Sequence, residues 1–344
     1  MKRLIFFFIL MSTQSFAGEE SLDLEETSQA IEKPVSYVPA APKIMGPKIM
    51  GRMDLSFENL PFENLAKTFK NSGFKNNHFL IFLKVKATEK VSFFGEILSK
   101  TFFEINYSPK NQVNIHLGKI QIPFGETSRY HHFYGGVQGF GAVGVFFPNI
   151  WAEPGANLEW QFSSFDLDTY LVNGISAPTT NDDPSFTGTA DSGTMAFGIR
   201  MTGHLFSKIK LIGSGYYDHW QVGKPLYMLG GDLIFDYGAL IKNLKISTGF
   251  ANGFVRQGVL GNYRRYGDFI EISTNALSFV EPRFRYGTFI NNSLISSQKD
   301  THSFDLGFNF KIDQLNLLAE YQWNFESVDE KKNDLLRVML ALDF

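Results

Sequence analysis

The sequence contains no cysteine among its 344 residues. This absence excludes a disulfide framework, an iron–sulfur centre and a zinc–thiolate site. Beyond residue 17 no stretch approaches eighteen continuous apolar residues, so a transmembrane helix is not expected either. Neither sign of charge is in large excess, with 32 Lys and Arg against 35 Asp and Glu. The formal net charge is −3, which argues against a nucleic-acid-binding protein.

Aromatic side chains, by contrast, are plentiful. They make up 15% of the sequence, with 36 Phe, 13 Tyr and 4 Trp. Transmembrane β-barrels carry a girdle of aromatic side chains at each membrane interface, and such girdles would account for this excess. The chain is long enough for one large barrel or for two ordinary domains.

The N-terminus has the parts of a secretory signal. Two basic residues at 2–3 precede an apolar run at 4–11, and small residues lead up to Ala17. The apolar run is too short to span a bilayer as a helix. We therefore predict a signal peptide over residues 1–17, cleaved after Ala17, in preference to a buried N-terminal strand.

The next segment, 18–48, differs from everything after it. It begins acidic and becomes rich in proline, which disfavours regular secondary structure. We predict a flexible periplasmic segment here. The remaining residues, 49–344, are expected to form one β-sheet domain.

Short stretches with a two-residue period recur throughout 49–344. Sixteen can be delimited, and fourteen strands also fit because the boundaries are approximate. The expected strands are 50–58, 79–87, 90–98, 102–108, 112–122, 156–163, 165–175, 193–206, 208–220, 226–238, 243–256, 264–276, 279–292, 300–311, 314–326 and 333–344.

The last stretch, 333–344, shows the alternation clearly. Its even-numbered positions from Leu336 to Phe344 are apolar, whereas the other face carries Arg337 and Asp343. In a soluble sandwich the polar face would meet bulk water, and in a membrane barrel it would line the lumen. Periodicity alone does not separate the two. The export signal and the aromatic content favour an all-β fold that is a transmembrane antiparallel β-barrel.

The connections between these strands alternate in length. Counted back from the C-terminus, every second one is very short, as at 312–313 and 277–278, and those between are longer, as at 293–299. Only 99–101 departs from this rule. Short periplasmic turns opposite longer outer loops are typical of outer-membrane barrels.

The longest connection is the third outer loop, residues 123–155. A structureless connection of this length is usually functional. It is rich in aromatic residues and glycine and carries few charges, so we predict that it folds into the lumen and sets the pore size. An outward lid, or an interface with a neighbouring barrel, would bury the same rings. The constriction-loop candidates are Arg129, His131, His132, Phe133, Tyr134, Trp151 and Glu153.

These features together resemble the sixteen-stranded porins of Gram-negative outer membranes, whose third loop folds inward and narrows the channel. The terminal Phe344 is similar to the assembly signal of outer-membrane barrels, and LGKIQIPFGE (117–126) is similar to the segment that leads into this loop in phosphate- and polyphosphate-selective porins. The resemblance implies an outer-membrane location, recognition by the barrel-assembly machinery and a homotrimer. The second loop, 99–101, is too short for the latch of general trimeric porins, so the chain departs from the trimer pattern there.

If the alternation continues along every strand, nine basic and twelve acidic side chains point inward. No ring of one charge sign is therefore predicted. One interpretation is a hydrated, roughly neutral wall. The other is that two arginines two residues apart on one strand attract anions in a narrowed lumen, with a wall salt bridge to a glutamate as their competing role. The candidate lumen residues are Arg283, Arg285, Glu271, Arg265, Arg200, Lys84 and Lys86.

Enzymatic chemistry is not predicted. The sequence has neither a G-x-S-x-G nucleophile motif nor an EF-hand loop. His131 and His132 are adjacent and would diverge in extended chain, so they do not form a joint metal site. We predict no catalytic residue, no cofactor and no metal.

The leading functional hypothesis is a porin with a water-filled channel for passive diffusion of small hydrophilic solutes or ions. The alternatives are a substrate-selective channel of the anion or phosphate type, and a narrow barrel with a structural or adhesive role. The expected partners are outer-membrane lipid, the diffusing solutes and the barrel-assembly machinery, and nucleic acid is not among them.

Overall fold

The computed structural model describes residues 45–64, 67–97, 102–126, 152–174, 195–205, 208–221, 224–236, 244–256, 262–275, 279–292, 299–326 and 334–344. The predicted signal peptide lies outside these ranges, as does most of the predicted flexible segment 18–48. No helix within the ranges is long and apolar enough to cross a membrane.

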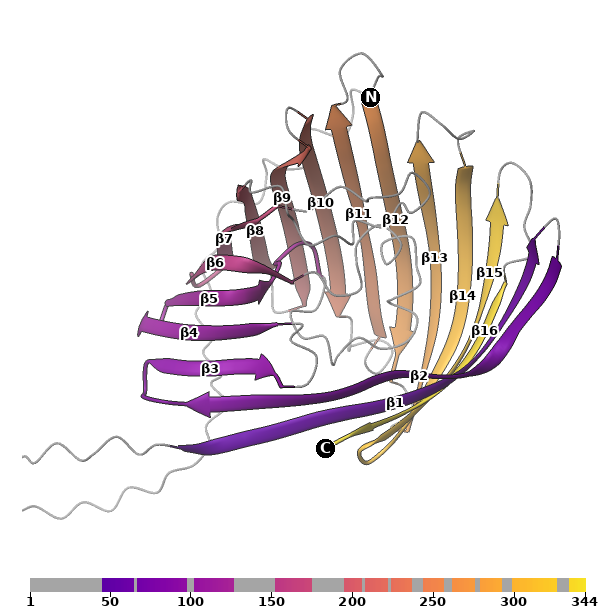
Figure 1. Ribbon diagram of the computed structural model, residues 1–344, viewed down its shortest axis with the longest axis horizontal. Helices are drawn as coiled ribbons and strands as arrows, with labels where there is room; N and C mark the ends of the chain where they lie inside the picture. Colours follow the sequence, from indigo (N-terminus) through magenta and orange to yellow (C-terminus); the bar gives the residue numbers. More distant parts are fainter. Residues whose placement is uncertain are drawn as a thin grey trace, which may run out of the picture. The chain divides into compact units, whose positions relative to one another are not determined.

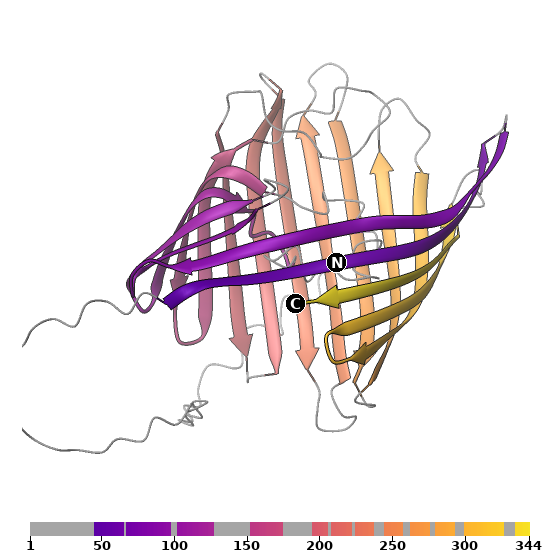
Figure 2. The same cartoon turned by 60° about the horizontal axis from the view of Figure 1, so that its bottom comes forward.

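A closed, antiparallel barrel accounts for all of the described strands (Figure 1). Each strand pairs with its neighbours in sequence, and the first pairs with the last to close the sheet (Figure 2). The prediction of sixteen strands is confirmed. The strands are β1 (Met45–Asn64), β2 (Lys67–Lys86), β3 (Val91–Glu96), β4 (Phe103–Lys110), β5 (Val113–Gln121), β6 (Ala152–Gln161), β7 (Phe165–Asn173), β8 (Met195–Leu205), β9 (Ile209–Gln221), β10 (Lys224–Asp236), β11 (Leu244–Arg256), β12 (Asn262–Thr274), β13 (Val280–Asn292), β14 (Lys299–Ile312), β15 (Leu315–Glu326) and β16 (Leu335–Asp343).

The two faces of the barrel follow the predicted alternation. On β16, Leu336, Val338 and Leu340 are 37–44% exposed on the outer face, whereas Leu335 and Met339 are buried on the inner face. The same two-residue period separates exposed from buried side chains on β8 and β14. An apolar outer face is what a barrel surrounded by lipid requires.

The inner face is less polar than the alternation predicts. Phe82 of β2, Phe94 of β3 and Phe102 just before β4 pack together, with ring centroids 5.3–6.0 Å apart, and each is at most 5% exposed. This part of the wall forms a small hydrophobic core. The hydrated, roughly neutral wall, which is one interpretation of the inner face, therefore does not extend over this part of the barrel.

The wall is uneven in strand length. Strands β3 to β7 have six to ten residues, whereas β9 to β15 have twelve to fourteen (Figure 1). At a rise of about 3.3 Å per residue, the longer strands can cross a hydrocarbon layer even when they are tilted.

The β1–β2 hairpin is longer than predicted. Both strands have twenty residues, and their ladder continues to the pair Asn64↔Lys67. The expected strands 50–58 and 79–87 leave residues 59–78 as a connection, and this expectation is wrong: β1 begins before residue 50, and both strands continue through most of 59–78. The stretch contains Pro61, Gly73 and several asparagines, which favour turns, and pairing with a neighbouring strand overrides that preference.

Candidate functional site

The chain leaves the wall at the end of β5, where the predicted third loop begins. Pro123 has no backbone N–H and cannot continue the ladder. Gly125 has a φ of 62°, a left-handed conformation that glycine adopts without strain. Phe124 is only 2% exposed. Residues 123–126 are therefore packed inside the barrel.

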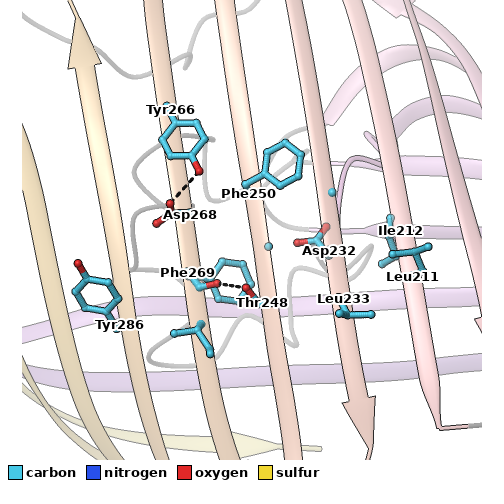
Figure 3. A pocket seen from close by; sticks show the side chains of 13 residues that line it. Leu211, Ile212, Asp232, Leu233, Thr248, Phe250, Tyr266, Asp268, Phe269 and Tyr286 are labelled. Atoms are coloured by element: carbon cyan, nitrogen blue, oxygen red, sulfur yellow. Dashed lines mark hydrogen bonds between the residues drawn. The ribbon is translucent and has the colours of Figure 1, made fainter. Parts of the chain in front are cut away.

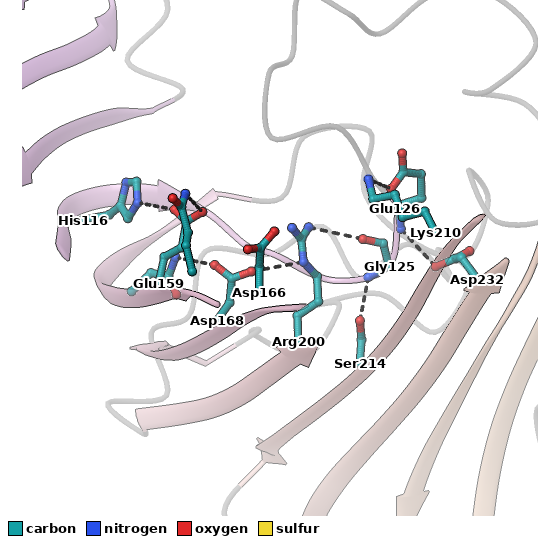
Figure 4. Close-up of polar contacts among 12 residues, drawn as sticks. His116, Gly125, Glu126, Glu159, Asp166, Asp168, Arg200, Lys210, Ser214 and Asp232 are labelled. Carbon is teal, nitrogen blue, oxygen red and sulfur yellow. Dashed lines mark hydrogen bonds and ion pairs between the residues drawn. The ribbon is translucent and has the colours of Figure 1, made fainter. Parts of the chain in front are cut away.

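Hydrogen bonds tie this segment to strands on the inner wall that lie far away in sequence (Figure 4). The Gly125 N–H donates to Ser214 Oγ of β9 at 2.9 Å. The Glu126 N–H donates to Asp232 Oδ2 of β10 at 3.0 Å. We name residues 123–126 the loop root, because they form the first part of the predicted third loop.

Two ion pairs strengthen the same attachment. Lys210 Nζ of β9 lies 2.6 Å from Glu126 Oε2. The Arg200 guanidinium of β8 donates to the Gly125 carbonyl at 3.4 Å and lies 3.1 Å from Asp168 Oδ2 on the neighbouring β7 (Figure 4). Asp168 is buried, and a guanidinium has donors enough to hold a carboxylate and a carbonyl together. Arg200 therefore links the wall to the loop root.

The Phe124 ring lies over Gly230 of β10. A Cβ added to Gly230 would lie 2.6 Å from the nearest atom of that ring, so glycine is needed for this close approach.

Replacing Gly230 with leucine is expected to push Phe124 away from the wall. Overpacking of this kind costs about 1–3 kcal/mol. Single-channel recordings in a planar bilayer should then show a larger or fluctuating conductance. The matched control is Gly203→Ala on β8, where the nearest atom to the added Cβ is 3.8 Å away. Identical recordings for Gly230→Leu and the parent protein would contradict the role given to this contact.

A second polar group lines the wall beside the loop root, on β4 to β7. His116 lies between Glu159 Oε2 at 3.2 Å and Glu104 Oε2 at 3.5 Å. Asn157 donates to Asp168 Oδ1 at 3.1 Å, which connects this group to the Arg200 pair. The carboxylates offer hydrogen-bond acceptors and negative charge at this part of the wall.

The two predicted arginines, Arg283 and Arg285, differ in how deeply they are buried. Arg285 is 2% exposed and pairs in register with Glu271 on one side and Asp305 on the other, and its guanidinium lies 4.3 Å from the centroid of the Phe269 ring. Each of these carboxylates is also at most 3% exposed. Arg285 is thus a buried member of a charged row, and its surroundings match the competing salt-bridge interpretation.

Arg283 has a different setting, close to the end of the barrel that carries the short turns. Its Nη2 lies 2.7 Å from Glu281 Oε1, and Lys311 Nζ lies 2.9 Å from the other oxygen of the same carboxylate. The Arg283 and Lys311 side chains are 18% and 46% exposed. These two cations, unlike Arg285, are accessible to solvent.

Removing the fully buried Arg285 should cost more stability than removing the partly exposed Arg283. Arg285→Ala leaves Glu271 and Asp305 buried without their cation, and breaking such a pair typically costs about 3–5 kcal/mol. Arg283→Ala should cost less, because Lys311 Nζ still lies 2.9 Å from the Glu281 carboxylate after the change. Urea titration of the refolded barrel measures both. Equal unfolding free energies for the two variants would contradict the burial difference.

The remaining predicted residues fall into three groups. Lys84 and Lys86 are exposed and lie on the same face of β2 as the buried Phe82. Arg265 pairs with Asn291 in the β12–β13 ladder, and its side chain lies outside the described part of the structure. The predicted loop residues Arg129, His131, His132, Phe133, Tyr134 and Trp151 also lie outside the described residues.

Glu153 needs a correction. It was expected in the constriction loop 123–155, but β6 begins at Ala152, so Glu153 belongs to the wall. It pairs in register with Ile120 of β5, and both are buried. The proline at 154 and the glycine at 155 suggested a loop, and strand pairing again overrides that local preference.

Sequence reasoning included Arg200 among the lumen candidates but missed Ser214 and Lys210 as partners of the loop root. Parity could have placed Ser214 and Lys210 on the inner face of β9. Nothing local in the sequence relates them to Gly125 and Glu126, which are 84 to 89 residues away. Within the described ranges, no three His, Asp or Glu side chains are grouped so that they could hold a metal ion.

Comparison with known proteins identifies the fold. No protein-family model matches the sequence, and no curated protein matches it. Solved structures do match. An anion-selective porin from Comamonas acidovorans superposes with a TM-score of 0.65 at 12% identity, covering 87% of this chain and 99% of that one.

Two further structures agree. OmpT, an outer-membrane protein of Vibrio cholerae, gives a TM-score of 0.61 at 10% identity over 88% of this chain and 100% of its own. The outer membrane channel DcaP of Acinetobacter baumannii gives 0.60 at 9% identity, over 87% and 97%. The barrel therefore has the fold of outer-membrane porins.

Proposed function

We propose that this protein is an outer-membrane porin that forms a water-filled channel for passive diffusion of small hydrophilic solutes. The observation that carries the proposal is the loop root. It leaves the wall of a closed sixteen-stranded barrel and bonds to the inner faces of β8, β9 and β10. A barrel of this size leaves an aqueous lumen unless loops fill it, and an inward loop narrows it without closing it.

The remainder of the loop, residues 127–151, is proposed to continue inward and to set the pore size. This proposal is supported by the contacts that the chain makes with the barrel wall just before residue 127 and just after residue 151. The root is held by Ser214 and Asp232, and the chain re-enters the wall at β6 through the buried Ala152 and Glu153. Loop closure costs only about 0.6 kcal/mol more per doubling of length, so burial of the loop aromatics is expected to outweigh it.

We propose general diffusion in preference to anion selectivity. The comparison porin from Comamonas acidovorans is described as anion-selective. In this chain, however, the described lumen arginines lie against carboxylates. Arg200 contacts Asp168, Arg283 contacts Glu281, and Arg337 contacts Glu320. Paired charges of both signs leave no strong single-sign field to attract anions.

A liposome-swelling assay tests the proposal directly. Purified protein is reconstituted into lipid vesicles, which are then diluted into isotonic solutions of neutral sugars of increasing size. We expect rapid swelling with monosaccharides and progressively slower swelling with larger sugars. Vesicles that swell no faster than protein-free vesicles in any sugar would refute a diffusion channel. Uptake of one sugar out of proportion to its size would favour a substrate-selective channel instead.

A further inference from the structure

The outer face of the barrel changes sharply from apolar to polar side chains. On β14 every outward position from Phe304 to Ile312 is apolar, and His302 is the next outward residue toward the end that carries the longer connections. That end faces the outside in outer-membrane barrels. These nine residues, at about 3.3 Å each in a strand tilted by about 40°, span roughly 20–25 Å, close to the height of the lipid-facing band. The outer edge of the hydrocarbon therefore lies between Phe304 and His302.

Neighbouring strands change at the same register. The strand pairings define a last, largely apolar row of Phe304, Tyr286 and Ile270 and a first polar row of His302, Thr288 and Asp268. Tyr286 links the two rows, because its hydroxyl lies 2.9 Å from His302 Nδ1. Asp268 therefore stands at the level of the lipid head groups, just outside the hydrocarbon. This placement rests on the outer-membrane location of the barrel.

Local hydroxyl groups satisfy only part of the Asp268 carboxylate. The Tyr266 hydroxyl donates to Asp268 Oδ2 at 2.9 Å, and the Thr288 hydroxyl of β13 donates to Oδ1. An ionised carboxylate can accept about four hydrogen bonds. A head group that lies against this position is therefore favoured when it brings N–H or O–H donors of its own.

A cation stands farther out on the same face of β12. Arg264 is exposed, and its Nε donates to Asn252 Oδ1 of β11 at 2.9 Å. Its Cζ lies 5.8 Å from the centroid of the Tyr266 ring. Asn252 uses one of the five N–H donors of the guanidinium, which favours phosphate as a partner because two parallel hydrogen bonds fit it. The outer end of this face is thus suited to an anion.

A groove of about 480 Å³ runs from these polar residues into the apolar band on the outer surface of β9 to β12 (Figure 3). Tyr266 and Asp268 line its outer end, and Leu211, Leu233 and Ile270 line it nearer the short turns. A groove of this size with a mainly apolar lining and a few polar groups at one end is typical of a binding site for an amphiphile. We name the groove, together with Arg264, the outer lipid site.

We propose that the outer lipid site binds a phosphorylated amino-sugar lipid of the outer leaflet. An acyl chain lies in the groove, the amide N–H and hydroxyl groups at the head of the chain donate to Asp268, and a phosphate binds Arg264. The site presents an apolar surface, then an acceptor, then a cation, in that order toward the outside. An N-acylated sugar phosphate has its chain, its donors and its anion in the same order. A diacyl phospholipid joins its chains through esters, which have no N–H or O–H to offer Asp268.

The spacing of the two charges is compatible with this arrangement. Arg264 and Asp268 are four residues apart on one strand, which is about 13 Å at about 3.3 Å per residue. A phosphate bound at Arg264 is therefore kept away from the carboxylate. The Tyr266 ring fills the distance between them and offers an aromatic face to a sugar ring, as interfacial tyrosines do at the edge of a membrane.

Native mass spectrometry of the full-length protein in detergent tests the site, because each bound lipid is resolved by its mass. The probes are lipid A, which is a phosphorylated and N-acylated amino-sugar lipid, its dephosphorylated form, and phosphatidylglycerol. We expect lipid A to bind about tenfold more tightly than phosphatidylglycerol. Equal affinities would show a general attraction for anionic lipids and would overturn the proposal. A protein that binds no lipid A would overturn it as well.

Two variants locate the contacts. Arg264→Gln should weaken lipid A binding by about tenfold, as expected when a charge-assisted hydrogen bond is lost, and should leave binding of the dephosphorylated lipid unchanged. Asp268→Asn should weaken the binding of both forms alike. The matched control is Lys90→Gln, which removes one positive charge from the exposed turn between β2 and β3 at the other end of the barrel. Undiminished binding by Arg264→Gln, or an equal loss with Lys90→Gln, would refute the site.

Conductance in a planar bilayer separates this proposal from the channel proposal. The outer lipid site lies outside the lumen, so Arg264→Gln and Asp268→Asn should keep the conductance of the parent protein, which also reports that both variants have folded. If the parent protein selects lipid A but does not conduct, the channel proposal fails and the lipid site stands. If it conducts but does not distinguish the lipids, the lipid site fails and the channel stands.

Discussion

Deleting residues 131–147 is expected to raise the single-channel conductance by about twofold or more, because a sixteen-stranded barrel without an inward loop leaves a wide aqueous lumen. The deletion keeps the loop root, so the contacts of Gly125 with Ser214 and of Glu126 with Asp232 should persist. It also keeps Trp151 and the start of β6. Planar-bilayer recordings in concentrated salt measure the change.

A control deletion in another outer connection, residues 294–297 between β13 and β14, should leave the conductance close to that of the parent protein. A loop that lies outside the lumen as a lid or a contact between barrels would give a different result. Deleting 131–147 would then leave the size of the open channel unchanged. That outcome would contradict the inward placement of the third loop.

Deleting Phe344 is expected to remove most of the protein from the outer membrane while costing the finished barrel little stability. Phe344 completes the closing seam, because its N–H and carbonyl both bond to Gly51 of β1, at 3.0 and 2.7 Å. Its ring lies where a side chain at Gly51 would otherwise be. Two backbone hydrogen bonds contribute only about 1–3 kcal/mol in total, a small part of a sixteen-strand ladder.

The two effects are measured separately. Membrane fractionation gives the amount of assembled barrel in cells, and urea titration of protein refolded in detergent gives its stability. Phe344→Tyr, which keeps the backbone and an aromatic ring, is the control and should assemble normally. Normal outer-membrane levels of the deletion would contradict an assembly role. A large loss of stability in detergent would show that the residue acts in the finished barrel.

The strand count could be predicted because a lipid-facing surface imposes a strict two-residue period. On β14, Phe304, Leu306 and Phe308 are exposed and Asp305 is buried, as their parity indicates. The prediction failed where that period is absent. The β1–β2 hairpin continues through 59–64 and 67–78 because each strand bonds to the other, and this pairing is invisible in the composition of either strand.

Parity places a residue on a face but says little about its surroundings there. It put Arg283 and Arg285 on the same inner wall, yet one contacts solvent and the other is almost fully buried. The difference depends on neighbours such as Phe269 and Asp305 on adjacent strands. Parity would also have placed Asp268 on the outer face, where an acidic residue among apolar ones is a clear signal.

The attachment of the loop root was beyond sequence reasoning for a similar reason. Proline and glycine at 123 and 125 indicate that β5 ends there. The partners on β8, β9 and β10 are determined by how the barrel curves and closes, which no local pattern records. The aromatic content of the loop predicts that it is buried, without distinguishing the lumen from a neighbouring barrel.

Single-channel recording of the purified protein in a planar lipid bilayer tests the central claim most directly. The account predicts discrete, long-lived conductance steps that grow in proportion to salt concentration, as expected for ions moving through a water-filled pore. A reversal potential close to zero in a salt gradient should accompany them, since the described lumen arginines lie against carboxylates. A correctly folded barrel that produces no conductance steps would contradict the claim and identify the protein as a closed structural barrel.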